Sequence, residues 1–281
     1  MTDMVGFIGL GSMGAPMAGR LVGWPGGVMV YDVRDEATAR FAGTGADIAA
    51  GLADIAAADI VSVAVLDDAQ VREVVADLAG HAAPGTVIAI HSTIGDSTAA
   101  ELSDRFAPRR IHIVDAPVSG GGGAAENGEL AIMVGADREV YERIKPAFKQ
   151  MGSMIIHAGG PGAGTRMKLA RNMLTFIGFA AACEAMELAE ANGISLAQLG
   201  RVVRHTDALT GGPGAIMVRE DLATLAPDHW LHDAFTHTCG LGEKDLGLAL
   251  ALGEAKGVDL PLAQVALQNL AAGLGVPHPK E

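Results

Sequence analysis

The sequence predicts an α/β protein, in which a doubly wound, mostly parallel sheet comes first and an all-helical domain, joined to it by a long helix, comes second. Three observations lead to this fold class. Short β-branched runs alternate with alanine-rich stretches up to residue 160. A glycine-rich turn directly follows the first run. A glycine and proline segment, residues 159–164, is followed by no further convincing strand.

Seven short apolar runs are the predicted strands. Several of them are apolar at nearly every position, which is expected when helices cover both faces of a parallel sheet. The alanine-rich stretches between the runs supply the crossover helices, and the first of these covers 15–22. The strands are predicted at 5–9, 28–32, 60–65, 86–90, 111–115, 130–134 and 154–157.

The glycine and proline segment marks the predicted domain boundary, so we expect domains at 1–162 and 163–281. The second domain begins with a long helix over 165–192, which ends at Asn192-Gly193, a pair that readily adopts a left-handed C-cap. Ser195 followed by Gln198 fits a capping box for the next helix. Further helices are predicted at 215–222, 233–256 and 261–273.

Composition excludes several classes of function. The formal net charge is -13, from 20 Lys and Arg against 33 Asp and Glu, which repels a polyphosphate backbone, so nucleic acid is not an expected partner. Cys183 and Cys239 lack any metal-binding spacing, so neither a disulfide framework nor a bound metal is expected.

The longest apolar stretch, 173–183, is about half of the roughly 20 residues that cross a bilayer. With Asp3 and several glycines breaking the N-terminal apolar run, we expect no membrane span, no signal peptide and a cytoplasmic location.

The glycine-rich turn fits a dinucleotide-binding site of the Rossmann type. The first glycine permits a tight turn, the second lets the backbone approach a pyrophosphate, and the third lets helix and strand pack closely. With 38 glycines in the chain, a chance GxGxxG match is a real concern, but the strand-turn-helix context supports the assignment. The expected cofactor contacts in this turn are Gly9, Leu10, Gly11, Ser12, Met13 and Gly14.

Asp32 ends the second predicted strand, at about the 20-residue spacing after the glycines that such sites show. Its carboxylate accepts hydrogen bonds from an adenosine ribose and repels a 2′-phosphate, which favours NAD. Arg34 leaves NADP as the alternative, because an arginine just past this strand can hold that phosphate. The other interpretation of Arg34 is a solvated surface charge.

Three further segments carry polar groups that need an explanation. Residues 115–123, DAPVSGGGG, place the Ser119 hydroxyl beside successive backbone N–H groups, which suits either a carboxylate or a flexible glycine-rich connection. At the start of the long helix, Lys168 and Asn172 are four residues apart and share a face. The alternative for Lys168 is a lysine whose ammonium reaches solvent from a helix end. The third segment contains Phe235 and Lys244. It could bring a second lysine to the same cleft, or Lys244 could form an ordinary surface ion pair.

Together these segments resemble the β-hydroxyacid dehydrogenase family, which includes 3-hydroxyisobutyrate dehydrogenase and tartronate semialdehyde reductase. The resemblance covers nearly the whole chain and implies a 6-phosphogluconate dehydrogenase-like C-terminal domain. Its motifs appear in order as GFIGLGSMGAPMA, DAPVSGG, GAGTRMKLARN and EKDLGLAL, which begin at Gly6, Asp115, Gly162 and Glu243.

The resemblance implies a role for each matching position. Lys168 matches the family's catalytic lysine, and Asn172 the asparagine that helps to place it. The loop that holds the substrate carboxylate matches Ser119, Gly120 and Gly121. Phe235 and Lys244 match residues that line the nicotinamide end of the cleft, while Leu66 and Thr93 match cofactor contacts that follow two strands.

The resemblance implies hydride transfer between NAD and a small 3-hydroxy acid or semialdehyde, with Lys168 as general acid and base. Burial and nearby cations would have to lower the lysine pKa from about 10.4 for this task. His91 and His157 are weaker alternative bases, and Asp115 is expected to orient the Ser119 loop.

Two competing functions are an imine reductase and a non-catalytic nucleotide-binding scaffold. Lys168 argues against both, because imine-reducing relatives carry Asp or Tyr there and scaffolds have lost the lysine.

Residues 205–214 depart from the Ser-rich segment of 3-hydroxyisobutyrate dehydrogenases, and Arg171 stands where many relatives are neutral. The apolar long helix predicts a homodimer or homotetramer.

Overall fold

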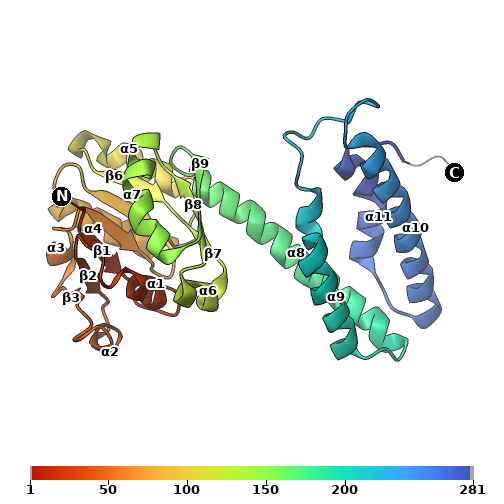
Figure 1. Cartoon of the computed structure of the whole chain (residues 1–281), viewed down its shortest axis with the longest axis horizontal. Coiled ribbons are helices and arrows are strands. Elements are labelled where there is room, and N and C mark those ends of the chain that lie inside the picture. The colour runs from red at the N-terminus through yellow and green to blue at the C-terminus, as the bar shows by residue number, and fades with distance from the viewer. Residues whose placement is uncertain (1, 279–281) are drawn as a thin grey trace. The chain divides into compact units, whose positions relative to one another are not determined.

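The computed structural model describes residues 2–278, and its packing divides the chain into two compact units, Met1–Asn172 and Met173–Glu281. Helix α8 (Ala163–Ala191) contributes residues to both units. The predicted domain boundary, between 162 and 163, falls at the start of this helix and stays a prediction. Figure 1 shows the order of the elements along the chain.

The first unit is built on one nine-stranded sheet with the order β3-β2-β1-β4-β5-β6-β8-β7, and β9 pairs with β8. Strands β3 to β6 along this order are all parallel, β8 is antiparallel to β6 and β7, and β9 is parallel to β8. The mostly parallel, doubly wound fold class is therefore confirmed. The strands are β1 (Val5–Ile8), β2 (Val28–Tyr31), β3 (Asp47–Ile48), β4 (Ile60–Val63), β5 (Val87–Ile90), β6 (His112–Asp115), β7 (Val118–Ser119), β8 (Ala131–Gly135) and β9 (Met154–Gly159).

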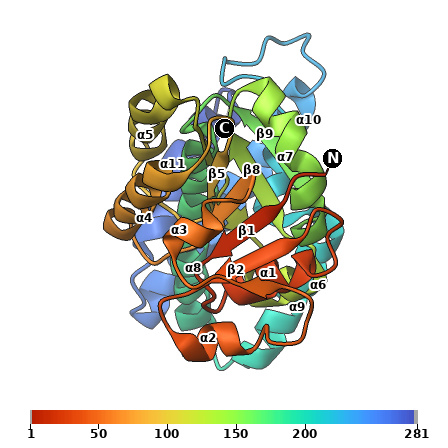
Figure 2. The same cartoon turned by 90° about the vertical axis from the view of Figure 1, so that its left-hand side faces the viewer.

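Helices cover both faces of this sheet, as Figure 2 shows. Neighbouring residues of one strand point to opposite faces, so Ile60 packs into one hydrophobic core and Val61 into the other. Burial on both faces explains why the strands are apolar without alternation. One face is covered by α1 (Gly14–Leu21), α6 (Gly121–Asn127) and α7 (Arg138–Met151), and the other by α3 (Leu52–Ile55), α4 (Asp68–His81) and α5 (Thr98–Phe106).

The sequence did not predict β3 and β7, which have two residues each. Such short strands carry no measurable periodicity, and their pairing depends on the neighbouring strand. The short α2 (Asp35–Ala39) and the 3-10 turn at Ala107–Arg109 were also not predicted.

The second unit is helical in the part of it that the structure describes. Its helices are α9 (Leu196–Thr210), α10 (His232–Lys256) and α11 (Pro261–Leu274), with a 3-10 helix at Gly212–Ile216. Glu184 of α8 accepts hydrogen bonds from the backbone N–H groups of Leu262 and Ala263, at 2.7 and 3.1 Å. Its carboxylate thus satisfies two backbone donors that the first turn of α11 leaves unpaired.

One helix prediction in the second unit is wrong, and the capping box predicted for α9 does not form, although α9 begins where it was predicted. Residues 217–231 form turns and bends rather than the predicted helix over 215–222. Ser195 is the N-cap of α9, but its side chain makes no capping hydrogen bond, and the Gln198 N–H bonds the Ser195 carbonyl instead. The predicted end of the long helix holds, because Gly193 adopts a left-handed φ of 70°.

Within residues 2–278, no helix combines the length and the apolar character that crossing a membrane requires. Over the same range, no set of three or more His, Cys, Asp and Glu side chains is arranged to hold a metal ion.

Candidate active site

A cleft of about 710 Å³ opens in the first unit where strands β1 and β4 end. Because the strand order reverses beside β1, this is the switch point at which doubly wound sheets bind ligands. Its lining residues are Ile8, Gly9, Gly11, Ser12, Met13, Gly14, Tyr31, Asp32, Val33, Arg34, Leu52, Ala64, Val65, Leu66, Gln70, Glu73, Val74 and Asp77.

The glycine-rich turn after β1 fits a dinucleotide. Gly9 has a φ of 88°, and a Cβ there would lie 2.3 Å from the Ala64 carbonyl oxygen. A Cβ at Gly14 would lie 1.8 Å from the Gly9 carbonyl oxygen, so this position requires glycine for the turn to meet α1. A Cβ at Gly11 meets nothing within 4 Å, and Gly11 lines the cleft. The open space over Gly11 is where a pyrophosphate approaches the backbone in such turns.

A Gly11→Ala variant should therefore keep the fold but lose cofactor affinity. We expect the NADH dissociation constant to rise at least about tenfold, or about 1.4 kcal/mol, with an unchanged melting temperature. Fluorescence titration and thermal unfolding measure the two quantities. Gly14→Ala is the contrasting variant, because its added methyl meets backbone and should lower the melting temperature. Normal NADH affinity in Gly11→Ala would contradict a pyrophosphate at this turn.

Asp32 lies at the end of β2 with its side chain only 7% exposed. Its carboxylate accepts hydrogen bonds from the Leu10 N–H at 2.7 Å and the Arg34 N–H at 3.0 Å, and it pairs with the Arg34 guanidinium at 3.1 Å. Burial by itself raises the pKa of Asp32, but the hydrogen bonds from Arg34 and Leu10 outweigh burial and lower it. Asp32 is therefore ionised at neutral pH, and Arg34 is paired with it rather than fully solvated.

The two cofactor contacts that were predicted after β4 and β5 lie in different surroundings. Leu66 follows β4, lines the cleft and is 84% exposed. Thr93 follows β5, is exposed and is not among the lining residues of the cleft. Neither assignment as a cofactor contact is tested by the geometry alone, so both stay predictions.

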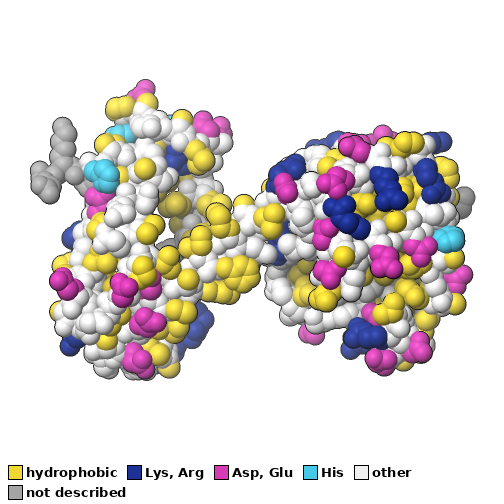
Figure 3. Space-filling model, turned by 180° about the vertical axis from the view of Figure 1, so that it is seen from behind, with side chains coloured by type: hydrophobic (Ala, Val, Ile, Leu, Met, Phe, Trp, Pro, Cys, Tyr) yellow, Lys and Arg dark blue, Asp and Glu magenta, His cyan; other side chains and the backbone are white. Residues whose placement is uncertain are grey.

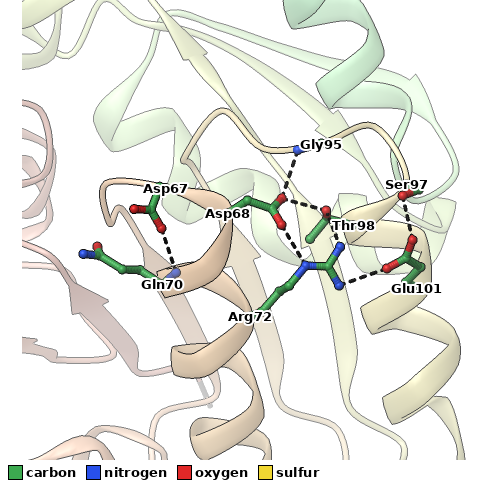
Figure 4. A network of polar contacts seen from close by, with 8 residues as sticks. All are labelled: Asp67, Asp68, Gln70, Arg72, Gly95, Ser97, Thr98 and Glu101. Carbon is green, nitrogen blue, oxygen red and sulfur yellow. Dashed lines mark hydrogen bonds and ion pairs between the residues drawn. The ribbon is translucent and has the colours of Figure 1, made fainter.

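A polar network holds the segment that carries Thr93 (Figure 4). Asp68, in the first turn of α4, accepts hydrogen bonds from the Gly95 N–H at 3.0 Å and the Thr98 hydroxyl at 2.7 Å. Arg72 donates to Asp68, Thr98 and Glu101, at 2.7, 2.8 and 2.9 Å. The network joins α4 to the start of α5, and so restrains the residues between β5 and α5.

Sequence reasoning missed the face of α4 that lines the cleft. Gln70, Glu73, Val74 and Asp77 recur at spacings of three and four residues, which place them on one side of the helix. That spacing was visible in the sequence, but only the sheet topology turns this side toward the glycine-rich turn.

The segment from Asp115 to Gly123 is ordered rather than a flexible connection. Val118 and Ser119 form β7, and α6 begins at Gly121. Gly120 and Gly121 have φ values of 136° and 74°, which few other residues adopt. Ser119 thus lies at the turn between a strand and a helix, directly before the two glycines.

Lys168 is buried on α8, with 9% of its surface exposed, so it is not a solvated helix-end lysine. Its Nζ donates a hydrogen bond of 2.6 Å to the carbonyl oxygen of Val118, the residue before Ser119. Burial, and secondarily the positive charge of Arg171, lower the pKa of the Lys168 ammonium below its ordinary value. The structure therefore brings a basic amine against the Ser119 segment.

The remaining predicted residues are placed as follows. Asn172 is half-buried on α8, and its Oδ1 accepts a hydrogen bond of 3.4 Å from Arg171. Phe235 is 6% exposed in the apolar core of the second unit, with Leu231 and Leu274. Lys244 is exposed and pairs with Asp245 at 3.1 Å. Their roles in the site stay predictions.

Both histidines considered as bases have structural hydrogen bonds. The His91 ring lies between Phe7 and Phe148, donates through Nδ1 to the Ala116 carbonyl at 2.8 Å, and accepts at Nε2 from the Ser62 hydroxyl at 3.0 Å. Burial lowers the pKa of His91 to about 4. His157 bonds the Ala136 carbonyl through Nε2 at 2.7 Å. The Nδ1 of His157 lies 3.3 Å from an Arg138 guanidinium nitrogen, so both nitrogens of each ring have hydrogen-bond partners.

One expectation about Asp115 is corrected. Its carboxylate accepts hydrogen bonds from the backbone of Gly162 and Thr165 at the start of α8, so it orients this helix and not the Ser119 loop.

Comparison with known proteins identifies the family of this chain. Residues 4–160 match a family model described as the NAD binding domain of 6-phosphogluconate dehydrogenase, and residues 162–276 match one described as NAD-binding of NADP-dependent 3-hydroxyisobutyrate dehydrogenase. The chain belongs to the β-hydroxyacid dehydrogenase family. As a member of this family it is an NAD(P)-dependent dehydrogenase of hydroxy acids.

Three relatives illustrate the range of similarity. An uncharacterized oxidoreductase of Mycobacterium tuberculosis H37Rv is 62% identical over 99% of this chain and 95% of its own. A crystal structure of a protein named as an oxidoreductase, from Mycobacterium avium 104, is 70% identical, with a TM-score of 0.95 over 98% of this chain and 99% of its own. A structure of Mycobacterium tuberculosis 3-hydroxyisobutyrate dehydrogenase with L-serine is 32% identical, with a TM-score of 0.69 over 96% and 93% of the two chains.

Proposed function

We propose that this dehydrogenase interconverts a small 3-hydroxy acid and its semialdehyde, as 3-hydroxyisobutyrate dehydrogenases do, with Lys168 as general acid and base. The observation that carries the proposal is the buried Lys168 amine, 2.6 Å from the Val118 carbonyl oxygen. A buried lysine with a lowered pKa suits proton transfer near neutral pH better than an exposed lysine does.

Each group of the chain has a separate task in this proposal. The Ser119 hydroxyl and the backbone N–H groups of Gly120 and Gly121 bind the substrate carboxylate. Neutral Lys168 accepts the hydroxyl proton of the substrate at Nζ during oxidation, and its ammonium returns a proton during reduction. Asn172, one turn along α8, orients the substrate hydroxyl. Bound NAD supplies the hydride acceptor, which is the cofactor's own chemistry.

Charge in the cleft supports NAD as the preferred cofactor. Among its described lining residues, Asp32, Glu73 and Asp77 are acidic and Arg34 is basic. Arg34 is paired with Asp32, so a 2′-phosphate brought there would meet an excess of negative charge. We therefore expect NADP to bind more weakly than NAD.

A substrate panel tests this function. Short 3-hydroxy acids, L-serine among them, the matching semialdehydes and cyclic imines are assayed with NAD and NADP by nicotinamide absorbance. We expect turnover of at least one 3-hydroxy acid, with a higher kcat/KM for NAD. Binding of NADH without turnover of any compound would favour the scaffold function, and turnover of cyclic imines alone would favour imine reduction.

We also propose that the protein forms a homodimer or homotetramer through α8. No residue from 173 to 188 is buried in the chain by itself, and Met173, Phe176 and Phe179 are 61, 63 and 61% exposed. Figure 3 shows hydrophobic side chains gathered on the surface of this helix. An apolar stretch of helix such as 173–183 is normally covered, and a second copy offers a matching apolar surface.

Light scattering after size exclusion should give at least twice the 28.6 kDa chain mass. A Phe176→Glu, Phe179→Glu double variant should shift the protein toward one chain mass, because it places charges in the proposed interface. A single-chain mass for the unaltered protein at micromolar concentration would contradict the oligomer.

A further inference from the structure

We infer that Asp115 is a positioning residue for Lys168, because its carboxylate ties the first turn of α8 to the end of β6. This inference rests on the proposed function, in which Lys168 transfers the substrate proton. Asp115 itself does not touch substrate, since its two oxygens accept from the backbone of Gly162 and Thr165 at the start of α8.

The hydrogen bonds of Asp115 use both carboxylate oxygens. Oδ1 accepts the Gly162 N–H at 2.7 Å and Oδ2 accepts the Thr165 N–H at 2.6 Å, and the residue is 0% exposed. A buried carboxylate with two short bonds to backbone donors holds them more strongly than a neutral acceptor would. The start of α8 is therefore fixed to the sheet at two points.

Two glycines allow this close approach. A Cβ at Gly135 of β8 would lie 2.1 Å from Asp115 Oδ1, and a Cβ at Gly164 would lie 2.2 Å from the Met133 carbonyl oxygen. The first turn of α8 is thus packed against the ends of β6 and β8 without room for a side chain between them. Because the packing is this close, the start of α8 can occupy only one position relative to the strands.

The short stretch from the end of β6 to the start of β7 holds both the helix start and the lysine. Thr165 and Lys168 are three residues apart on α8, so they lie on neighbouring parts of one face. Asp115 bonds Thr165, and Val118, three residues after Asp115, accepts the hydrogen bond from Lys168 Nζ. Loss of the first contact lets α8 move away from this segment, which would expose Lys168 to water and raise its pKa toward the ordinary value.

The test compares Asp115→Asn with a matched control, Glu184→Gln. Glu184 accepts two backbone N–H groups at the start of α11, as Asp115 does for α8, but it lies more than four turns beyond Lys168 along α8. Both variants remove the charge from a helix-capping carboxylate. A purely structural role of Asp115 would therefore make the two variants behave alike.

The first readout is the pH dependence of Lys168 acetylation by a trace of acetic anhydride, followed by mass spectrometry of the protein without substrate. We expect Asp115→Asn to raise the midpoint by about one pH unit, a tenfold change in the acidity constant, and Glu184→Gln to leave it unchanged. The second readout is the pH profile of kcat for oxidation, whose rising limb should move to higher pH by a similar amount, with KM within about twofold.

Equal acetylation midpoints in Asp115→Asn and the unaltered protein would overturn the inference. Asp115→Ser, whose hydroxyl is too short to reach both donors, is the second variant and should shift the midpoint in the same direction. If neither variant folds while Glu184→Gln does, Asp115 supports the unit as a whole and the positioning role is overturned. The acetylation readout needs no turnover, so it stands apart from a failure of the proposed function, which normal turnover by Lys168→Ala would show.

Discussion

Replacement of Lys168 by alanine should lower kcat by about 10³- to 10⁴-fold, at the upper end of what a positioned acid and base contributes. The change removes the Nζ that lies 2.6 Å from the Val118 carbonyl oxygen and, in our proposal, receives the substrate proton. The glycine-rich turn and Asp32 are untouched, so the NADH dissociation constant should stay within about threefold of its original value. Steady-state kinetics and NADH fluorescence titration measure the two effects.

Lys168→Arg separates proton transfer from charge. Arginine keeps a cation on α8, but it is not deprotonated in proteins, so we expect it to restore little of the lost kcat. Lys149→Ala, at an exposed position of α7, is the control for removing a lysine and should turn over normally. Near-normal turnover by Lys168→Ala would exclude this lysine as the acid and base.

Folding stability should fall by about 3 kcal/mol between pH 6.5 and pH 4 because of His91 alone. Burial lowers the pKa of His91 from 6.5 to about 4, so the unfolded chain binds a proton in this range and the folded protein does not. At about 1.4 kcal/mol per pKa unit, the free energy of unfolding loses nothing through His91 above pH 6.5. It then decreases as the pH falls, and the decrease is complete below pH 4. Urea unfolding at several pH values measures the decline.

His91→Gln isolates this contribution from that of the carboxylates. Its amide can still bond the Ala116 carbonyl and the Ser62 hydroxyl, but it does not titrate. The variant should be less stable at pH 7, since the ring packs between Phe7 and Phe148, and its stability should depend less on pH. Parallel pH profiles for the variant and the unaltered protein would show that His91 does not hold a lowered pKa.

The fold was predictable where local patterns are strong. The apolar strand runs, the glycine-rich turn and the Asn192-Gly193 end of α8 all follow from the backbone and burial needs of single elements. The failures came where a weak pattern meets tertiary context. Residues 215–222 look helical, but the chain after Gly212–Ile216 forms turns instead. There, Arg219 donates to the nearby Ala223 carbonyl and also to the carbonyl of Gly273, a long-range contact that local propensity does not contain.

The residues of the candidate site also divide into those that local sequence patterns predict and those that depend on tertiary contacts. Gly9, Gly14 and Asp32 could be found from spacing, because a tight turn and a strand end constrain the residue types directly. The acidic face of α4 and the capping role of Asp115 could not be found, since each depends on elements far apart in the chain. A carboxylate at a strand end could accept hydrogen bonds from several different segments, and only the folded structure shows which segment donates them.

The fold class and the family were predictable from sequence alone, and so was the position of the lysine that we propose as acid and base, because these depend on motifs whose residues are close together along the chain. The burial of this lysine against the β7 carbonyl, and the lowering of its pKa by burial and by Arg171, became known from the three-dimensional packing. The chemistry of an amine depends on how much water it has lost and which charges surround it. Those quantities are set when β6, β7 and α8, separate in the chain, pack together.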